Sequence, residues 1–178
     1  MKRDCSSLLI IDVQTRLAPA IHDSQRVVEH CIWLAGVAAR VGVPVVVTEH
    51  FPAKIGETVP ELKAATVDAR YVTKEFFSAK ADGCLSGTAI EERQQVVVCG
   101  TEAHVCVLQT ALDLCAAGKD VFVVAEASGS RLPAHRELGF ARMRQYGIEI
   151  VAHEMVAFEW LEKGGTDLFR AVSRDFIR

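Results

Sequence analysis

The sequence predicts an α/β protein, a three-layer α/β/α sandwich built on a six-stranded, mostly parallel sheet. The first observation is that short runs of β-branched residues are continuously apolar instead of alternating, as expected for strands covered on both faces. The second is that segments with helical periodicity separate these runs, which is typical of strand–helix–strand units with right-handed crossovers. The third is length, because 178 residues, 50% of them hydrophobic, suit one domain spanning residues 1–178.

The predicted strands follow from these runs. Five continuous runs are assigned to the sheet, at residues 8–12, 43–48, 96–100, 121–125 and 148–151. A sixth run, 70–74, is shorter and more polar, so we expect it at an edge of the sheet. The irregular segment 49–67 holds Pro52, Gly56 and Pro60 and is long for a simple connection. We therefore expect it to cover another part of the molecule.

The predicted helices follow from apolar residues at helical spacing. After a cap at Asp23 or Ser24, one helix has its apolar face at Val27, Cys31, Leu34, Ala35, Ala38 and Val41, and Gly42 ends it. A second helix starting near Val105 has its apolar face at Leu108, Leu112 and Cys115 and ends at Gly118. Three further helices are expected around residues 133–146, 155–163 and 167–176.

Composition and charge exclude several functional classes. With 20 Lys and Arg against 23 Asp and Glu, the net charge of −3 gives no basic surface for nucleic acid. No segment reaches the ~20 apolar residues that a membrane helix needs, and Asp12 interrupts the first apolar run before it resembles a signal peptide. We therefore expect a cytoplasmic protein with neither a nucleic-acid nor a membrane partner.

Three reactive side chains stand at the carboxyl ends of predicted strands, where parallel sheets bind ligands. Asp12 ends the first strand, Lys74 ends the edge strand, and Cys106 lies in the first turn of the helix after strand 96–100. A helix N-terminus and a nearby ammonium both favour a thiolate, so we expect a lowered pKa for Cys106. Asp12 can accept the thiol proton if burial raises its own pKa. Helix N–H groups can stabilise an oxyanion, which completes the groups needed for acyl transfer.

The segments LLIIDVQTRLAPAI, VTKEFFSA and CGTEAHVCVLQTALDLCAAGKDVFVVAEASGSR carry a resemblance that extends over nearly the whole chain. The sequence resembles the isochorismatase-like superfamily of cysteine hydrolases, in its branch of small isochorismatase-domain hydrolases related to nicotinamidases. The resemblance implies a catalytic triad of Asp12, Lys74 and Cys106. It also implies a cis peptide between Thr101 and Glu102, an oxyanion hole formed by the N–H groups of Glu102 and Cys106, a strand order of 3-2-1-4-5-6, and a homo-oligomer, either a dimer or a higher assembly.

The residues around this triad leave some alternatives open. Nicotinamidase relatives hold a divalent metal with one Asp and two His after the second strand, whereas this chain has only Glu49 and His50 there, so we predict no metal and no cofactor. We expect His104 to satisfy the turn before Cys106. A substrate pocket is assigned to Gln14, Phe51, Phe76 and Phe77, although aromatic residues near strand ends are also ordinary core.

The predicted function is a hydrolase that cleaves an amide-type C–N bond of a small molecule through an acyl-enzyme on Cys106. An intact triad favours this bond, because the resemblance implies that isochorismate hydrolysis does not need the cysteine. The alternative is a non-catalytic or redox-sensing thiol protein that keeps the fold. Of the other cysteines, Cys31, Cys99 and Cys115 are expected in the core, and Cys5 and Cys84 in polar segments. The apolar residues near the carboxyl end serve either self-association or packing within the chain, namely Phe158, Trp160, Leu161, Leu168 and Phe169.

Overall fold

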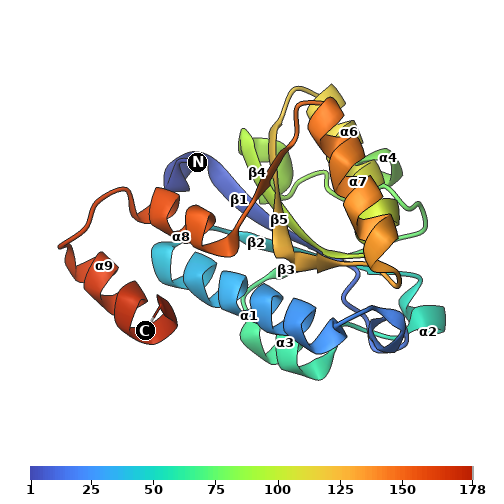
Figure 1. The fold of residues 1–178 in the computed structure, drawn as a ribbon, viewed down its shortest axis with the longest axis horizontal. Coiled ribbons are helices and arrows are strands. Elements are labelled where there is room, and N and C mark those ends of the chain that lie inside the picture. The colour runs from blue at the N-terminus through green and yellow to red at the C-terminus, as the bar shows by residue number, and fades with distance from the viewer. Residues whose placement is uncertain (178) are drawn as a thin grey trace.

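Six strands form one sheet in the order β3-β2-β1-β4-β5-β6, and each neighbouring pair is parallel (Figure 1). In this computed structural model, which describes residues 1–177, the strands are β1 (Ser6–Ile11), β2 (Val45–His50), β3 (Arg70–Lys74), β4 (Gln95–Thr101), β5 (Asp120–Gly129) and β6 (Glu149–Val151). The predicted fold class and strand order are confirmed, and β3 lies at an edge as expected. The order reverses between β1 and β4, so the carboxyl ends of these strands border the place where such sheets bind ligands.

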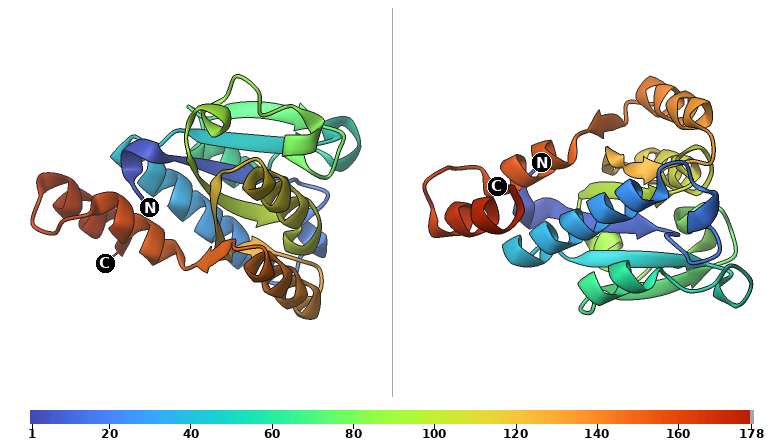
Figure 2. Two further views of the ribbon diagram at one scale, coloured as in Figure 1. Left: turned by 90° about the horizontal axis from the view of Figure 1, so that it is seen from above. Right: turned by 60° about the horizontal axis from the view of Figure 1, so that its bottom comes forward.

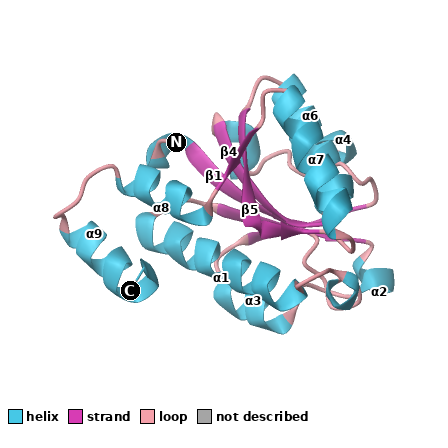
Figure 3. Cartoon of the chain, viewed as in Figure 1, coloured by secondary structure: helices cyan, strands magenta, loops and turns pink. Residues whose placement is uncertain are grey.

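Helices cover both faces of the sheet and give the three layers visible in Figures 1 and 3. One face carries α1 (Ser24–Val41) and α3 (Pro60–Ala65), with α8 (His153–Leu161) and α9 (Asp167–Val172) packed against α1. The other face carries α4 (Ala79–Asp82), α5 (Ala89–Glu92), α6 (Leu108–Ala116) and α7 (Pro133–Gln145). The short α2 (Pro52–Ile55) lies in the loop beyond the carboxyl end of β2.

The central strand explains why its sequence is continuously apolar. Leu8 and Ile10 of β1 pack in the core on the α1 side, whereas Leu9 and Ile11 pack in the core on the α6 side. All four side chains are fully buried. A strand that alternates between two cores has no solvent-facing positions and therefore no polar alternation.

The helix α1 confirms its predicted face, because the six apolar positions named for it are buried and Gly42 ends it with a φ of 78°. Asp23 is its N-cap residue, as predicted, but it has a φ of 53° and its side chain caps no N–H group.

The apolar face predicted for α6 is wrong by one residue. The buried positions are Val107, Thr110, Ala111 and Leu114, whereas Leu108, Leu112 and Cys115 are only partly buried. A wider, π-type turn at Ala103–Val107 precedes the helix. One residue inserted into such a turn rotates the following face by about 100°, which the apolar spacing alone does not reveal.

The two ends of the sheet have different coverings. On the carboxyl side, the segment after β2 runs back over the end of β1 and pairs Thr58 with Gln14 in an antiparallel bridge, as expected of a covering segment. On the opposite side, the carboxyl-terminal helices project beyond the sheet (Figure 2). Trp160 and Leu161 are buried there and Phe158 is exposed, so most of these apolar residues serve packing within the chain. Among the described residues, no helix is both long and apolar enough to cross a membrane.

Candidate active site

Asp12 stands immediately after β1, where the backbone turns with a φ of 51°. Its backbone N–H still donates to the Thr48 carbonyl at 3.2 Å, and its Oδ1 accepts the Thr48 hydroxyl at 2.6 Å. The residue is fully buried. Both strands β1 and β2 therefore fix the direction in which this carboxyl group points.

Lys74 ends β3, two strands away from Asp12, and its long side chain reaches the same point. Its Nζ lies 2.6 Å from Asp12 Oδ2, with both side chains shielded from solvent. The ammonium also donates to the carbonyls of Phe76 at 3.1 Å and Phe77 at 3.2 Å. Because an ammonium has only three N–H donors, these contacts leave none for another group.

Cys106 reaches this pair from β4. The peptide bond between Thr101 and Glu102 is cis, as the resemblance implied, and the Thr101 hydroxyl donates to the Asp12 carbonyl at 2.7 Å. The wide turn that follows directs the Cys106 thiol towards Asp12, beside the ammonium of Lys74. Only 6% of Cys106 is exposed. The three side chains nominated from strand ends are thus brought together.

The electrostatics of the thiol differ from the sequence-based expectation. The pKa of Cys106 is raised to about 12, chiefly by burial and next by the Asp12 charge, while the charge of Lys74 acts in the opposite direction. The expected lowering of this pKa is therefore wrong, because the site is too deeply buried and Lys74 is already paired with a carboxylate. Burial also raises the pKa of Asp12, against Lys74 and the hydrogen bonds from Thr48 and Cys106. The resting nucleophile is a thiol beside a carboxyl group that is suited to accept its proton.

Glu102 holds the next loop through Arg131, a residue that sequence reasoning missed. Arg131 Nη2 lies 2.7 Å from Glu102 Oε1, Nε lies 3.0 Å from Oε2, and the Arg131 backbone N–H also donates to Oε2 at 3.0 Å. Burial disfavours the charged carboxylate, yet these Arg131 contacts outweigh it and lower the pKa of Glu102. His104 lies beside this loop with Nδ1 3.0 Å from the Ser130 hydroxyl, which confirms its place in the turn.

Gln14 does not line an open pocket, contrary to expectation. Its Nε2 donates to the carbonyls of His50 at 3.0 Å and Gly56 at 2.5 Å, and its Oε1 accepts the His50 N–H at 2.8 Å. The residue is fully buried. Its amide is occupied by backbone groups, so its role is to hold the end of β2 in place.

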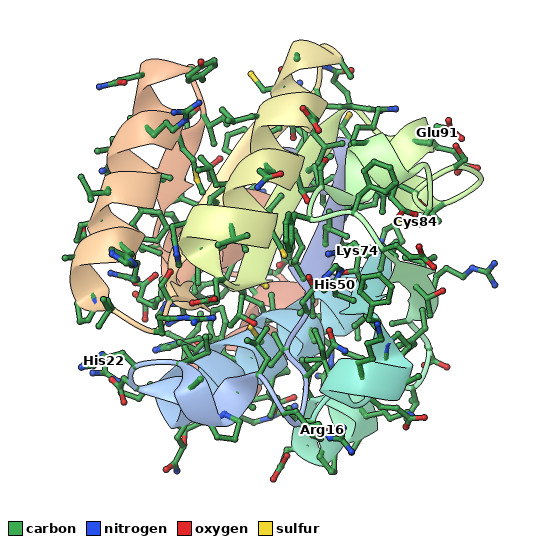
Figure 4. The ribbon with its side chains drawn as sticks, turned by 90° about the vertical axis from the view of Figure 1, so that its right-hand side faces the viewer. Arg16, His22, His50, Lys74, Cys84 and Glu91 are labelled. Atoms are coloured by element: carbon green, nitrogen blue, oxygen red, sulfur yellow. The ribbon has the colours of Figure 1, made fainter. Side chains whose placement is uncertain are left out.

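The three phenylalanines lie beside the triad instead of in the core. Phe76 and Phe77 are 60% and 52% exposed, and their carbonyls accept hydrogen bonds from Lys74. Phe51 follows His50, whose ring centroid lies 4.8 Å from that of Phe51 and 5.5 Å from that of Phe77. Figure 4 shows Lys74 and His50 close together on this rim. These aromatic side chains therefore line a partly exposed part of the rim, and their contact with a substrate stays a prediction.

The residues at the end of β2 do not fit a divalent metal. Glu49 Oε1 accepts the backbone N–H of Thr58 at 2.7 Å and its hydroxyl at 2.8 Å. Within the described residues, no three His, Cys, Asp or Glu side chains are grouped as metal ligands. His50 therefore has no companion ligands of the kind that such metals require.

The remaining cysteines differ in their surroundings. Cys31 and Cys99 are buried with their sulfur atoms 3.8 Å apart, which confirms that they pack in the core. Cys115 packs against the core on the α6 side but is only partly buried, because the buried face of α6 is rotated from the predicted one. Cys5 is exposed and Cys84 is half-buried.

Comparison with known proteins agrees with this geometry. Residues 6–155 match the family model of the isochorismatase domain. Isochorismatase domain-containing protein 2 of Danio rerio is 31% identical over 170 residues, which cover 95% of this chain and 85% of that protein. The secreted isochorismatase effector Isc1 of Phytophthora sojae is 33% identical over 175 residues, covering 95% and 83% of the two chains.

Solved structures give the same picture. The MAR1 ribonuclease of Caenorhabditis elegans superposes with a TM-score of 0.92 at 29% identity, covering 100% of this chain and 92% of that one. The YcaC protein of Escherichia coli, described as an octameric hydrolase of unknown specificity, superposes with a TM-score of 0.91 at 25% identity, covering 99% and 90%. The chain shares its fold with both over nearly its full length.

Proposed function

The chain belongs to the isochorismatase family and has its hydrolase fold, and we propose that it hydrolyses the C–N bond of a small amide with Cys106 as nucleophile. The observation that carries the proposal is the contact of one buried carboxyl group, that of Asp12, with both Lys74 and Cys106. A structural ion pair has no need of a thiol beside it. A nucleophile, its base and a charge partner need this arrangement.

The first half of the reaction transfers an acyl group to the enzyme. Asp12 accepts the proton of Cys106 as Sγ bonds to the amide carbon, and the carbonyl oxygen becomes an oxyanion. The N–H groups of Glu102 and Cys106 stabilise that charge. The C–N bond then breaks, and the amine leaves with the proton that Asp12 returns to nitrogen.

The second half releases the acid. Asp12 takes a proton from water, whose oxygen attacks the thioester carbon. The C–S bond breaks, and the proton on Asp12 returns to the thiolate of Cys106. Lys74 stabilises each state in which negative charge lies on Asp12 or the sulfur.

The redox-sensing alternative receives less support from the site. A peroxide sensor needs a thiolate with a low pKa and access to solvent. Burial raises the pKa of Cys106 to about 12, and the side chain is almost wholly covered. Proton transfer to Asp12 during acyl transfer avoids the need for a standing thiolate.

Variants of the nucleophile test the proposal. Turnover of a panel of amides, ureides and carbamates should be abolished in Cys106→Ala, and mass spectrometry should detect a thioester on Cys106 in the parent protein. Cys5→Ser is the matched control, since Cys5 is exposed and precedes β1, whereas Asp12 follows the other end of that strand. Undiminished turnover by Cys106→Ala contradicts covalent catalysis. RNA belongs in the panel, because a similar structure is described as a ribonuclease.

We also propose a homo-oligomer and a cytoplasmic location. The octameric state described for YcaC supports the oligomer, and so do Leu132, Leu138 and Tyr146, large apolar residues exposed at or beside α7. The location is a prediction from composition, and the effector Isc1 shows that a similar protein is secreted. Light scattering of the purified protein tests the first proposal, and cell fractionation tests the second.

A further inference from the structure

The polar side chains around the triad are almost all paired within the protein. The three donors of Lys74 are taken by Asp12 and two carbonyls. The Thr48 hydroxyl donates to Asp12, and the amide of Gln14 bonds to backbone groups. None of these side chains has a donor to spare for recognising a substrate.

His50 is different, because neither of its ring nitrogens has a hydrogen-bond partner among the described residues. The residue is only 9% exposed, and its Nδ1 is among the buried polar atoms without a partner. Buried polar groups are normally paired, so an unpaired one calls for an explanation. A bound ligand that supplies the missing hydrogen bond is such an explanation.

The fold places the His50 ring beside the triad and holds it there. His50 is the last residue of β2 and pairs in register with Lys74 of β3. The amide of Gln14 bonds both the N–H and the carbonyl of His50, so its backbone is fixed on both sides. The ring also packs near those of Phe51 and Phe77, with centroids 4.8 Å and 5.5 Å away.

Charge around the ring limits what it can recognise. Burial and the neighbouring ammonium of Lys74 lower the pKa of His50, so its imidazole is neutral and offers one donor and one acceptor. Asp12 and Lys74 neutralise each other. An anionic substrate would need a cation that is not already paired. The residue to test for that role is Lys54, whose Nζ lies 5.2 Å from the centre of the Phe51 ring.

We infer that His50 determines substrate specificity by hydrogen bonding to an uncharged polar group of a small amide, whose apolar part lies against Phe51 and Phe77. This inference rests on the proposed function, since it assigns the substrate class of the same site. It predicts discrimination against substrates that carry an additional charge. It also predicts that an apolar residue in place of His50 removes discrimination without removing the nucleophile.

Steady-state kinetics with three probes test the inference. Benzamide has no second polar group, 3-hydroxybenzamide has an uncharged one, and 3-carboxybenzamide has an anionic one. We expect the parent protein to favour the hydroxy compound, and His50→Leu to lower kcat/KM for that compound about tenfold or more, chiefly through KM. The ratio of kcat/KM for 3-hydroxybenzamide to that for benzamide should therefore fall in His50→Leu, and His50→Gln should restore it. Melting curves show whether each variant is folded.

Alkylation provides a readout that needs no turnover. The ratio of Cys106 labelling by iodoacetamide to labelling by iodoacetate should be high in the parent and fall in His50→Leu. Lys54→Met is the matched control and should leave that ratio unchanged. A fall with Lys54→Met alone would overturn the inference in favour of an anionic substrate, and so would an unchanged ratio and unchanged KM in His50→Leu. Failure of the proposed function itself has a different signature, because turnover would then survive in Cys106→Ala whatever the result with His50→Leu.

Discussion

The ammonium of Lys74 lies 2.6 Å from the carboxylate of Asp12, and neither side chain is open to solvent. Two charges removed from water are stable only as a pair, because each alone carries a large desolvation penalty. The pair joins β3 to β1 across the intervening strand β2. The same interaction thus holds the rim of the sheet together and sets the charge around the thiol.

Replacing one member of this pair should lower the free energy of unfolding more than replacing both. Lys74→Met leaves a buried carboxylate without its partner, which we expect to lower the free energy of unfolding by about 3–5 kcal/mol. The loss should shrink on acidification, since protonation removes the charge of Asp12. Adding Asp12→Asn to Lys74→Met should recover most of the stability, and Asn tolerates the positive φ at this position. Urea unfolding of the two single variants and the double variant measures the coupling, and strict additivity would contradict it.

Asp12→Asn should have opposite effects on thiol reactivity and on turnover. Asp12 is second to burial among the causes that raise the pKa of Cys106, and its removal also frees Lys74 to stabilise the thiolate. Alkylation of Cys106 by iodoacetamide should therefore accelerate at neutral pH while amide hydrolysis is lost. Peptide mapping separates this label from that on Cys5, which is exposed and serves as the internal control. Slower labelling of Cys106 in Asp12→Asn would show that the carboxylate promotes the thiolate in the resting protein.

Much of the fold and the triad could be predicted because their signals are local in sequence. Continuous apolar runs mark buried parallel strands, and the carboxyl ends of such strands share one rim. Asp12 and Lys74 each stand at such an end. Cys106 lies in the first turn after the next strand, and the family resemblance then added the cis peptide bond. The buried face of α6 was predicted one residue out of place, because the wider turn before the helix rotates every side chain that follows it.

The remaining features depend on distance through space. Arg131 is separated from Glu102 by 29 positions, and no local pattern connects them. The free ring nitrogens of His50 became apparent only once the neighbours of Gln14 and Lys74 were known. The direction of the pKa shift of Cys106 depends on how deeply the turn is buried. Spacing along the chain does not contain that information.

Glu102→Gln should reveal a pH-dependent contribution from the Arg131 contact. The pKa of Glu102 is lowered in the folded protein, so its carboxylate stabilises the fold above the unfolded value of 4.5 and ceases to do so as pH falls through the folded value. At neutral pH we expect a loss of about 1 kcal/mol, because the hydrogen bonds are charged but Arg131 is half in solvent. The difference between parent and variant should vanish in acid. Thermal unfolding across this pH range measures it, and a constant difference would point to a purely steric effect.

Replacing Gly100 should cost far more stability than replacing another glycine that has a positive φ. Its φ is 120°, and a Cβ there would collide with the carbonyl oxygen of Ile11 and lie 2.6 Å from the Ile11 nitrogen. Since that contact is backbone on backbone, Gly100→Ala must separate β1 from β4 where Asp12 and Thr101 meet. We expect a loss of about 3 kcal/mol or more, together with loss of turnover.

Gly118→Ala is the matched variant for this test. Gly118 has a φ of 85°, but a Cβ there meets nothing within 4 Å. Its cost is therefore that of a left-handed conformation alone, about 1–2 kcal/mol, with turnover retained. Urea unfolding and amide hydrolysis of both variants separate backbone strain from steric displacement of the site. Equal losses of stability and of turnover would mean that the close approach of β1 and β4 at Gly100 is not what positions Asp12 opposite Cys106.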